Sequence, residues 1–132
     1  MPVARVSVIN GASESKCVSA LIDTGSAYNL VAMTAAKTIL GMTEHRIMSE
    51  GKVREVRPLD GKNRKIFGWK VDMRIKCDST STTSLVLREI WIYVMEETHP
   101  DYPVLIGQDG SFEERVLRHH NRAANQFWEL RE

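Results

Sequence analysis

At Ala20-Leu21-Ile22-Asp23-Thr24-Gly25-Ser26-Ala27-Tyr28-Asn29-Leu30-Val31 an apolar strand runs directly into a carboxylate. A carboxylate is costly to bury unless hydrogen bonds or a second charge-sharing group receive it. Thr24 and Ser26 supply hydroxyls, and Gly25 lets the chain turn tightly and expose its amides beside Asp23. This layout predicts that Asp23 is a reactive carboxylate held at the end of a strand. An ordinary strand-to-turn junction is the alternative, because the same residue types are common in turns.

The composition indicates one folded domain. The chain has 132 residues, of which 42% are hydrophobic and 27% charged, so we expect a single domain over 1–132 with one core. Its apolar runs are too short to span a bilayer and no signal-peptide pattern opens it, so no membrane contact is expected. The two cysteines fit reduced thiols, which predicts a cytoplasmic protein. Cys17 and Cys77 are too few for a disulfide framework or a zinc site, so we expect no metal and no cofactor.

The charge is unevenly distributed along the chain. Residues 45–76 carry ten Lys and Arg against four Asp and Glu, so this segment is +6 and the remainder is −5. A basic stretch can mark a nucleic-acid surface. Here, however, acidic residues interrupt the basic ones, and the aromatic residues are limited to Phe67 and Trp69. A solvated hairpin face is therefore the favoured interpretation, and a nucleic-acid partner is not expected.

The first half of the chain alternates between apolar and polar residues in two places. Val3–Ile9 and Cys17–Ile22 flank an Asn-Gly turn, which predicts a hairpin that leads into Asp23. Residues 32–40 favour a short helix that stops at Gly41. The polar stretch 42–51 is predicted to be irregular.

The second half predicts a long hairpin and buried strands. Strands over 52–58 and 65–75 flank an Asp-Gly turn, and 85–95 is apolar enough for a central strand buried on both faces. Residues 104–106 predict a short buried strand that meets Gly107. A Ser followed by two Glu at the start of 111–120 predicts an amphipathic helix near the C-terminus. Residues 126–130 fit either a last strand or more helix.

In this order the segments resemble the retropepsin-like aspartic proteases of retroviruses and LTR retrotransposons, including their domesticated cellular relatives. Two stretches anchor the resemblance, Leu21–Ser26 and Leu105-Ile106-Gly107-Gln108-Asp109, with the long hairpin between them. It covers the chain from about Val3 to about Leu117. It implies a mostly β, closed barrel of the acid protease type, with one Asp-Thr-Gly per chain.

A chain with one Asp-Thr-Gly is half an enzyme in this family. The resemblance therefore implies a homodimer in which Asp23 faces its symmetry mate, and an aspartic endopeptidase that hydrolyses a polypeptide substrate. Elementary electrostatics agrees, because two carboxylates about 3 Å apart cannot both ionise and must share a proton. We expect a water activated between the two Asp23 carboxylates to attack a peptide carbonyl without a covalent intermediate.

The resemblance also assigns roles around Asp23. Thr24 corresponds to the residue that supports the dyad across the two-fold axis, and substrate backbone passes close to Gly25. Ser26, where the family has Ala or Ser, is expected to donate to the carboxylate, and Ala27 to line the substrate site. Gly107 corresponds to the second glycine, which packs behind the active-site loop.

The hairpin tip corresponds to the family's flap, which closes over an extended peptide. Its expected substrate contacts are Leu59, Asp60, Gly61 and Lys62. Viral flaps are glycine-rich and apolar, whereas this tip also carries Arg64 and Lys65. Gln108 replaces the Arg that is common after Gly107 in viral enzymes. These departures leave a second hypothesis open, a non-catalytic retropepsin-like module for dimerisation or peptide binding.

Overall fold

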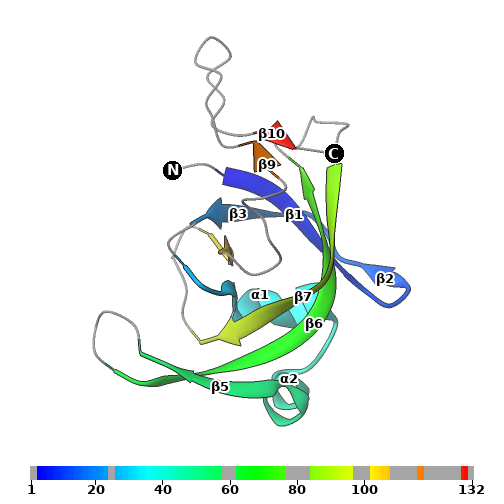
Figure 1. Cartoon of the computed structure of the whole chain (residues 1–132). Helices are drawn as coiled ribbons and strands as arrows, with labels where there is room; N and C mark the ends of the chain where they lie inside the picture. Colours follow the sequence, from blue (N-terminus) through cyan, green and yellow to red (C-terminus); the bar gives the residue numbers. More distant parts are fainter. Residues whose placement is uncertain are drawn as a thin grey trace.

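The fold is mostly β and contains a closed six-stranded barrel (Figure 1). This computed structural model describes residues 3–23, 26–57, 62–76, 84–96, 102–107, 116–117 and 129–130. The barrel order is β1-β3-β8-β4-β7-β6, and β6 pairs back with β1 to close it. The barrel strands are β1 (Val3–Asn10), β3 (Val18–Ile22), β4 (Asn29–Ala32), β6 (Arg64–Lys76), β7 (Ser84–Met95) and β8 (Val104–Ile106). β2 (Ser13–Glu14) and β5 (Lys52–Val56) extend the two ends of the sheet.

The predicted N-terminal hairpin is confirmed. β1 and β3 are antiparallel, with Val6 opposite Val18. Gly11 has φ 66° at the turn, a left-handed conformation that glycine adopts without a steric penalty. The hairpin ends at Ile22, so Asp23 is the first residue beyond a strand that is paired on both sides.

β8 lies between two strands that follow one another in the sequence. It runs parallel to β3 and antiparallel to β4, and Leu105 is the partner of both Leu21 and Leu30. β4 in turn runs parallel to β7. The segment between β3 and β4 must therefore cross the end of β8, which brings Gly107 against it.

The main core fills the barrel, as the alternation of the strands predicted. Every barrel strand contributes fully buried members to it, among them Val6, Val8, Ala20, Val31, Met73, Ile75, Leu87, Ile92, Val94 and Val104. A second cluster of Ile66, Tyr93 and Met95 is buried on the outer face. The last part of β7 is thus buried on both faces, as expected, whereas Arg88 and Glu89 in its middle are exposed.

The predicted short helix is present as α1 (Met33–Leu40). Gly41 ends it with φ 65°, which confirms the predicted stop. Met33, Ala36, Ile39 and Leu40 are buried, and the helix lies against β1, β4 and β7 (Figure 1).

The irregular segment predicted over 42–51 is wrong, because Glu44–Glu50 form α2. Thr43 caps the helix by accepting a hydrogen bond from the Arg46 amide at 3.2 Å. Arg46 and Glu50 form an (i, i+4) ion pair at 2.8 Å. Ile47 is the one buried side chain of α2. The sequence of this segment therefore lacks the repeated apolar residues that would have predicted a helix.

The helix predicted near the C-terminus is wrong where the structure describes it. Val116–Leu117, which lie within the predicted helix 111–120, form β9 and pair with β10 (Glu129–Leu130). Two adjacent apolar residues fit a strand as well as a helix, and long-range pairing decides between them. Of the two alternatives left open for 126–130, a last strand or more helix, the described residues Glu129–Leu130 form a strand, β10. The other residues of the predicted helix lie outside the described residues.

Candidate active site at the end of β3 and β8

Asp23 follows the parallel pair of β3 and β8 directly. Its amide donates a hydrogen bond to the Ile106 carbonyl at 2.8 Å, which continues the pairing by one residue. Its own carbonyl accepts a hydrogen bond from the Ser26 amide at 3.1 Å. Asp23 itself is half-buried. The carboxylate is therefore attached to a backbone that is fixed on both sides.

Ser26 stabilises the loop rather than the carboxylate. Its hydroxyl donates to the Tyr28 carbonyl at 2.9 Å and accepts from the Tyr28 amide at 3.3 Å. A hydroxyl has one proton, and a carbonyl can only accept. The expected donation from Ser26 to Asp23 is therefore absent from this arrangement, because the proton already serves Tyr28.

Gly107 packs behind the loop, as expected. A Cβ at this position would lie 2.4 Å from the Tyr28 carbonyl oxygen and 2.5 Å from that of Ser26. Both atoms belong to backbone and cannot move aside as a flexible side chain would. Only glycine therefore allows β8 to approach this closely, and the contact fixes the loop that follows Asp23.

Asn29 connects the start of β4 to Gly107 and to β7. The sequence did not predict this role. Asn29 is 1% exposed; its Oδ1 accepts from the Gly107 amide at 2.9 Å and its Nδ2 donates to the Trp91 carbonyl at 3.0 Å. Buried polar groups require such partners. One signal in the sequence could have indicated this role: Asn29 is a polar residue at the start of a strand that is otherwise apolar. A polar side chain in such a position is expected to have hydrogen-bond partners.

An apolar wall connects the Asp23 loop to the β5–β6 hairpin. Tyr28 contacts Tyr93 edge-on, with ring centroids 5.1 Å apart, and Tyr93 stacks on Trp91 at 6.2 Å. Leu30 and Val56 pack against the same cluster. Gly68 makes room for this wall, because a Cβ there would lie 2.6 Å from the Tyr93 ring. The wall therefore ties the residues that follow Asp23 to the hairpin.

The free edge of this wall is cationic. We call β5 together with residues 64–68 of β6, which pair with it, the arm. Lys52 Nζ lies 5.2 Å from the centroid of the Trp91 ring, and the Arg54 guanidinium 5.8 Å from that of Tyr93. These distances fall within the range of cation–π attraction.

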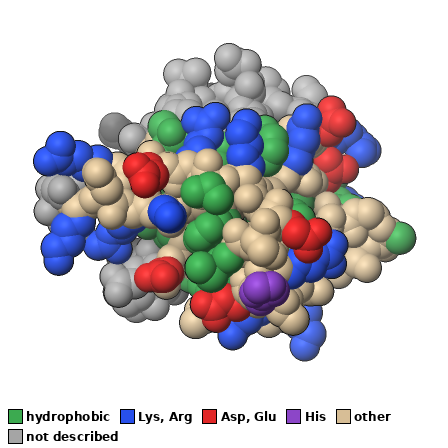
Figure 2. Space-filling model, turned by 90° about the horizontal axis from the view of Figure 1, so that it is seen from below, with side chains coloured by type: hydrophobic (Ala, Val, Ile, Leu, Met, Phe, Trp, Pro, Cys, Tyr) green, Lys and Arg blue, Asp and Glu red, His purple; other side chains and the backbone are tan. Residues whose placement is uncertain are grey.

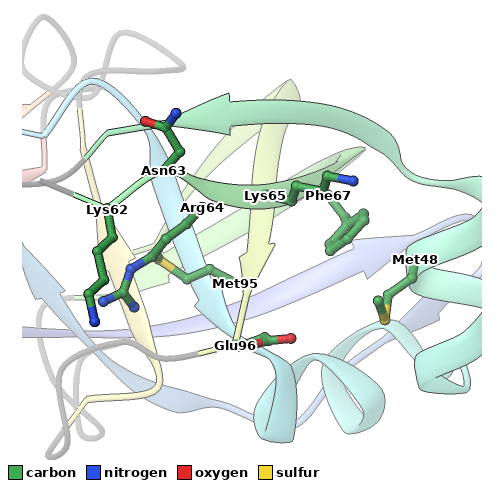
Figure 3. A pocket seen from close by; sticks show the side chains of 8 residues that line it. All are labelled: Met48, Lys62, Asn63, Arg64, Lys65, Phe67, Met95 and Glu96. Atoms are coloured by element: carbon green, nitrogen blue, oxygen red, sulfur yellow. The ribbon is translucent and has the colours of Figure 1, made fainter.

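The structure describes four of the predicted site residues. A backbone hydrogen bond joins Ser26 to Asp23, Ala27 is exposed, and Lys62 lines a cavity near the arm (Figure 3). The other five, Thr24, Gly25, Leu59, Asp60 and Gly61, lie outside the described residues. Within the part of the chain that the structure describes, no group of three or more His, Cys, Asp or Glu could hold a metal ion. In the same part, each helix is too short or too polar to cross a membrane.

Comparisons with family models, with curated proteins and with solved structures found no significant match to this chain.

Proposed function

We propose that this chain is one subunit of a homodimeric aspartic endopeptidase of the retropepsin type. The observation that best supports the proposal is the setting of Asp23. It directly follows β3, which pairs with β8; its amide donates to the Ile106 carbonyl, and Gly107 and Asn29 hold the residues that follow it. A catalytic carboxylate needs such a preorganised backbone, because it must meet its partner and the substrate with little freedom.

The proposed chemistry uses one Asp23 from each subunit. Two carboxylates held this close share one proton, so that one acts as general base and the other as general acid. The base removes a proton from a water, which attacks the peptide carbonyl, and the acid donates to the carbonyl oxygen. When the tetrahedral intermediate collapses, the leaving amine takes a proton. The titration belongs to the pair, so activity follows a bell-shaped pH profile.

The apolar wall supports an extended peptide as the substrate. Side chains alternate across an extended strand, so every second one can reach Tyr28 and Leu30 beside Asp23. The hairpin tip, including Lys62, closes over such a peptide in the proposed enzyme.

Solution mass and cleavage test the proposal together. We would measure the mass by light scattering at several concentrations and incubate the protein with a peptide library between about pH 4 and 7. Asp23→Asn keeps the shape but cannot share the proton, and we expect it to lower cleavage at least about 1000-fold while the mass stays dimeric. Glu44→Gln, an exposed carboxylate on α2, serves as the matched control and should cleave normally. A strict monomer, or equal cleavage by Asp23→Asn, would contradict the proposal.

A non-catalytic module for dimerisation or peptide binding is the second candidate. Two observations favour it: the Ser26 hydroxyl is directed to Tyr28, and the arm carries Arg64 and Lys65 where viral flaps are apolar. This candidate predicts a dimer that cleaves nothing in the same pH range.

A further inference from the structure

The face of β7 that is buried in the main core changes midway along the strand. Leu85 and Leu87 belong to that core, so regular alternation would next bury residue 89. Instead Arg88 and Glu89 are both exposed, and the core positions resume at Ile90. From Ile90 onward the even-numbered residues of β7 belong to the main core. Two consecutive exposed residues thus shift the alternation by one position.

A β-bulge between β6 and β7 accounts for this shift. Between two regular pairs, Asp72 of β6 lies opposite two residues of β7, Arg88 and Glu89. Two residues against one define a bulge, and the extra residue turns all later side chains of its strand to the other face. With unbroken alternation the odd-numbered residues of β7, Trp91 and Tyr93 among them, would point into the barrel. The bulge therefore sets these two aromatic residues on the outer face.

On the outer face both aromatic residues hold the candidate active site. The Tyr93 ring meets the Tyr28 ring edge-on, with centroids 5.1 Å apart. The Trp91 carbonyl accepts from Asn29 Nδ2 at 3.0 Å, and Asn29 Oδ1 accepts from the Gly107 amide at 2.9 Å. These contacts form only in the register that the bulge gives to β7.

The arm gives the apolar wall little alternative support. Most of β5 is exposed, and Figure 2 shows this side of the molecule with Lys, Arg, Asp and Glu side chains around a smaller group of hydrophobic ones. An exposed edge strand buries little apolar surface. The position of the wall therefore depends on how β7 pairs with β4 and β6, and the bulge is the irregular point of that pairing.

The backbone of the bulge adopts a conformation that most residues avoid. Glu89 has φ 53°, and among the described residues it is the only one other than glycine with a positive φ. L side chains adopt this conformation only at a cost in free energy. A bulge built on a glutamate therefore needs a partner that stabilises it.

Asp72 is that partner. Its Oδ1 accepts a hydrogen bond from the Glu89 amide at 2.8 Å, and Glu89 is missing from the regular pairs of β6 and β7. Its Oδ2 lies 3.6 Å from Arg88 Nη1, but the Arg88 side chain is 75% exposed, so this ion pair adds little. The hydrogen bond to the Glu89 amide needs an acceptor oxygen rather than a charge, so an Asn side chain can replace the carboxylate.

We propose that Asp72 is a positioning residue of the candidate active site. By stabilising the bulge, it fixes the register that places Trp91 and Tyr93 against the loop that follows Asp23. It acts through the Glu89 amide and β7 rather than through contact with a reacting atom. Its effect on substrate binding rests on the proposed endopeptidase, whereas its effect on the backbone can be measured without catalysis.

Amide hydrogen exchange of the full chain, resolved by residue, tests the proposal. Asp72→Ala removes the acceptor oxygen, and we expect it to speed exchange over residues 89–93 at least about fivefold while β1 and β3 stay within about twofold of wild type. Asp72→Asn keeps the acceptor and Arg88→Gln removes only the exposed ion pair, so both should stay within about twofold everywhere. Equally faster exchange in all strands, or equal effects of the Ala and Asn variants, would overturn the proposal.

A matched pair of Glu89 substitutions tests the same point with Asp72 intact. Glu89→Val places a β-branched side chain at φ 53°, where it is strained, so it should reproduce the faster local exchange. Glu89→Asn should leave the exchange as in wild type, because Asn adopts a positive φ more readily. This pair also decides the question if Asp72→Ala does not fold. Equal exchange in the two Glu89 variants would mean that the bulge does not control the wall.

Peptide cleavage separates this proposal from the proposed protease. In an active enzyme Asp72→Ala should raise KM at least about threefold and leave kcat within about twofold, because the wall is proposed to receive peptide side chains and Asp23 is unchanged. A lower kcat with an unchanged KM would contradict this role. A protein that cleaves nothing but shows the local change in exchange loses the protease and keeps the role of Asp72. An enzyme whose exchange and KM do not respond to Asp72→Ala keeps the protease and loses that role.

Discussion

The loop around Asp23 and the arm lie on one sheet, but their backbones are held in different ways. The loop is enclosed: Gly107 touches its carbonyls, and Asn29 joins it to β7. The arm pairs on one side only, and most of β5 is exposed. An enclosed segment can fix a reactive group, whereas an exposed edge can accept another chain. The difference predicts that substitutions in the loop cost stability and substitutions in the arm change binding.

Gly107→Ala should have the largest effect on stability. Its Cβ would overlap two carbonyl oxygens, so we expect the free energy of unfolding to fall by about 3 kcal/mol or more. Gly11→Ala is the control, because it meets no atom within 4 Å and has only the cost of its φ of 66°, about 1 kcal/mol. Urea unfolding followed by circular dichroism measures both. Equal losses would mean that the contact behind the loop does not constrain it.

Asn29→Ala should rank second. It leaves the Gly107 amide and the Trp91 carbonyl without this partner in a buried place, which costs about 2–4 kcal/mol. Asn63→Ala, at an exposed position beside the arm, should change the stability by less than about 0.5 kcal/mol. The same unfolding measurement applies. If Asn29→Ala is neutral, Asn29 does not hold the loop.

A matched pair of Val→Thr substitutions compares the two regions directly. Val31 in β4 is fully buried, so a hydroxyl there should cost about 1–3 kcal/mol. Val53 in β5 is 51% exposed, so Val53→Thr should stay within about 0.5 kcal/mol. Thermal unfolding of the two variants would detect the difference. Similar losses would show that the arm is as tightly packed as the barrel core beside the loop.

Glu14→Gln should have the smallest effect and a defined pH dependence. Hydrogen bonds from Arg74 and Ser7 lower the pKa of Glu14 from its usual value of 4.5. A lowered pKa adds stability above pH 4.5, and this stability is lost as the pH falls through the lowered pKa. The group is largely exposed, so the contribution at pH 7 is at most about 1 kcal/mol. The stability of wild type and variant, compared from pH 7 down to about pH 3, should converge at the acidic end. A constant difference would exclude the ionised carboxylate as its source.

Much of the local structure could be predicted from the sequence, because it depends on residues close together in the chain. The alternation of apolar and polar residues over 3–9 and 65–75 predicted two strands. Gly11 and Gly41 predicted a turn and the end of a helix. Gly107 behind the loop was also predicted, although through the family resemblance rather than from spacing. α2 escaped prediction because its single buried residue, Ile47, leaves no periodic pattern.

The candidate site was predicted in part, because its hydrogen-bond partners lie far apart in the sequence. The carboxylate at the end of a strand was visible in the order of residues around Asp23. The role of Asn29 was not, because its two partners are Gly107 and Trp91, which only the barrel brings next to it. The direction of the Ser26 hydroxyl was also beyond the sequence, since the Tyr28 carbonyl competes with Asp23 for one proton.

The sequence by itself therefore determined where strands and turns occur and which carboxylate stands at a strand end. Side-chain alternation and turn chemistry act over two to four neighbouring residues, so they can be inferred without the fold. The tertiary structure alone decided that β8 lies between β3 and β4, that Val116 and Leu117 form a strand, and that cations gather around one cavity. These features depend on contacts between distant segments, which are selected by burial and pairing in the whole molecule.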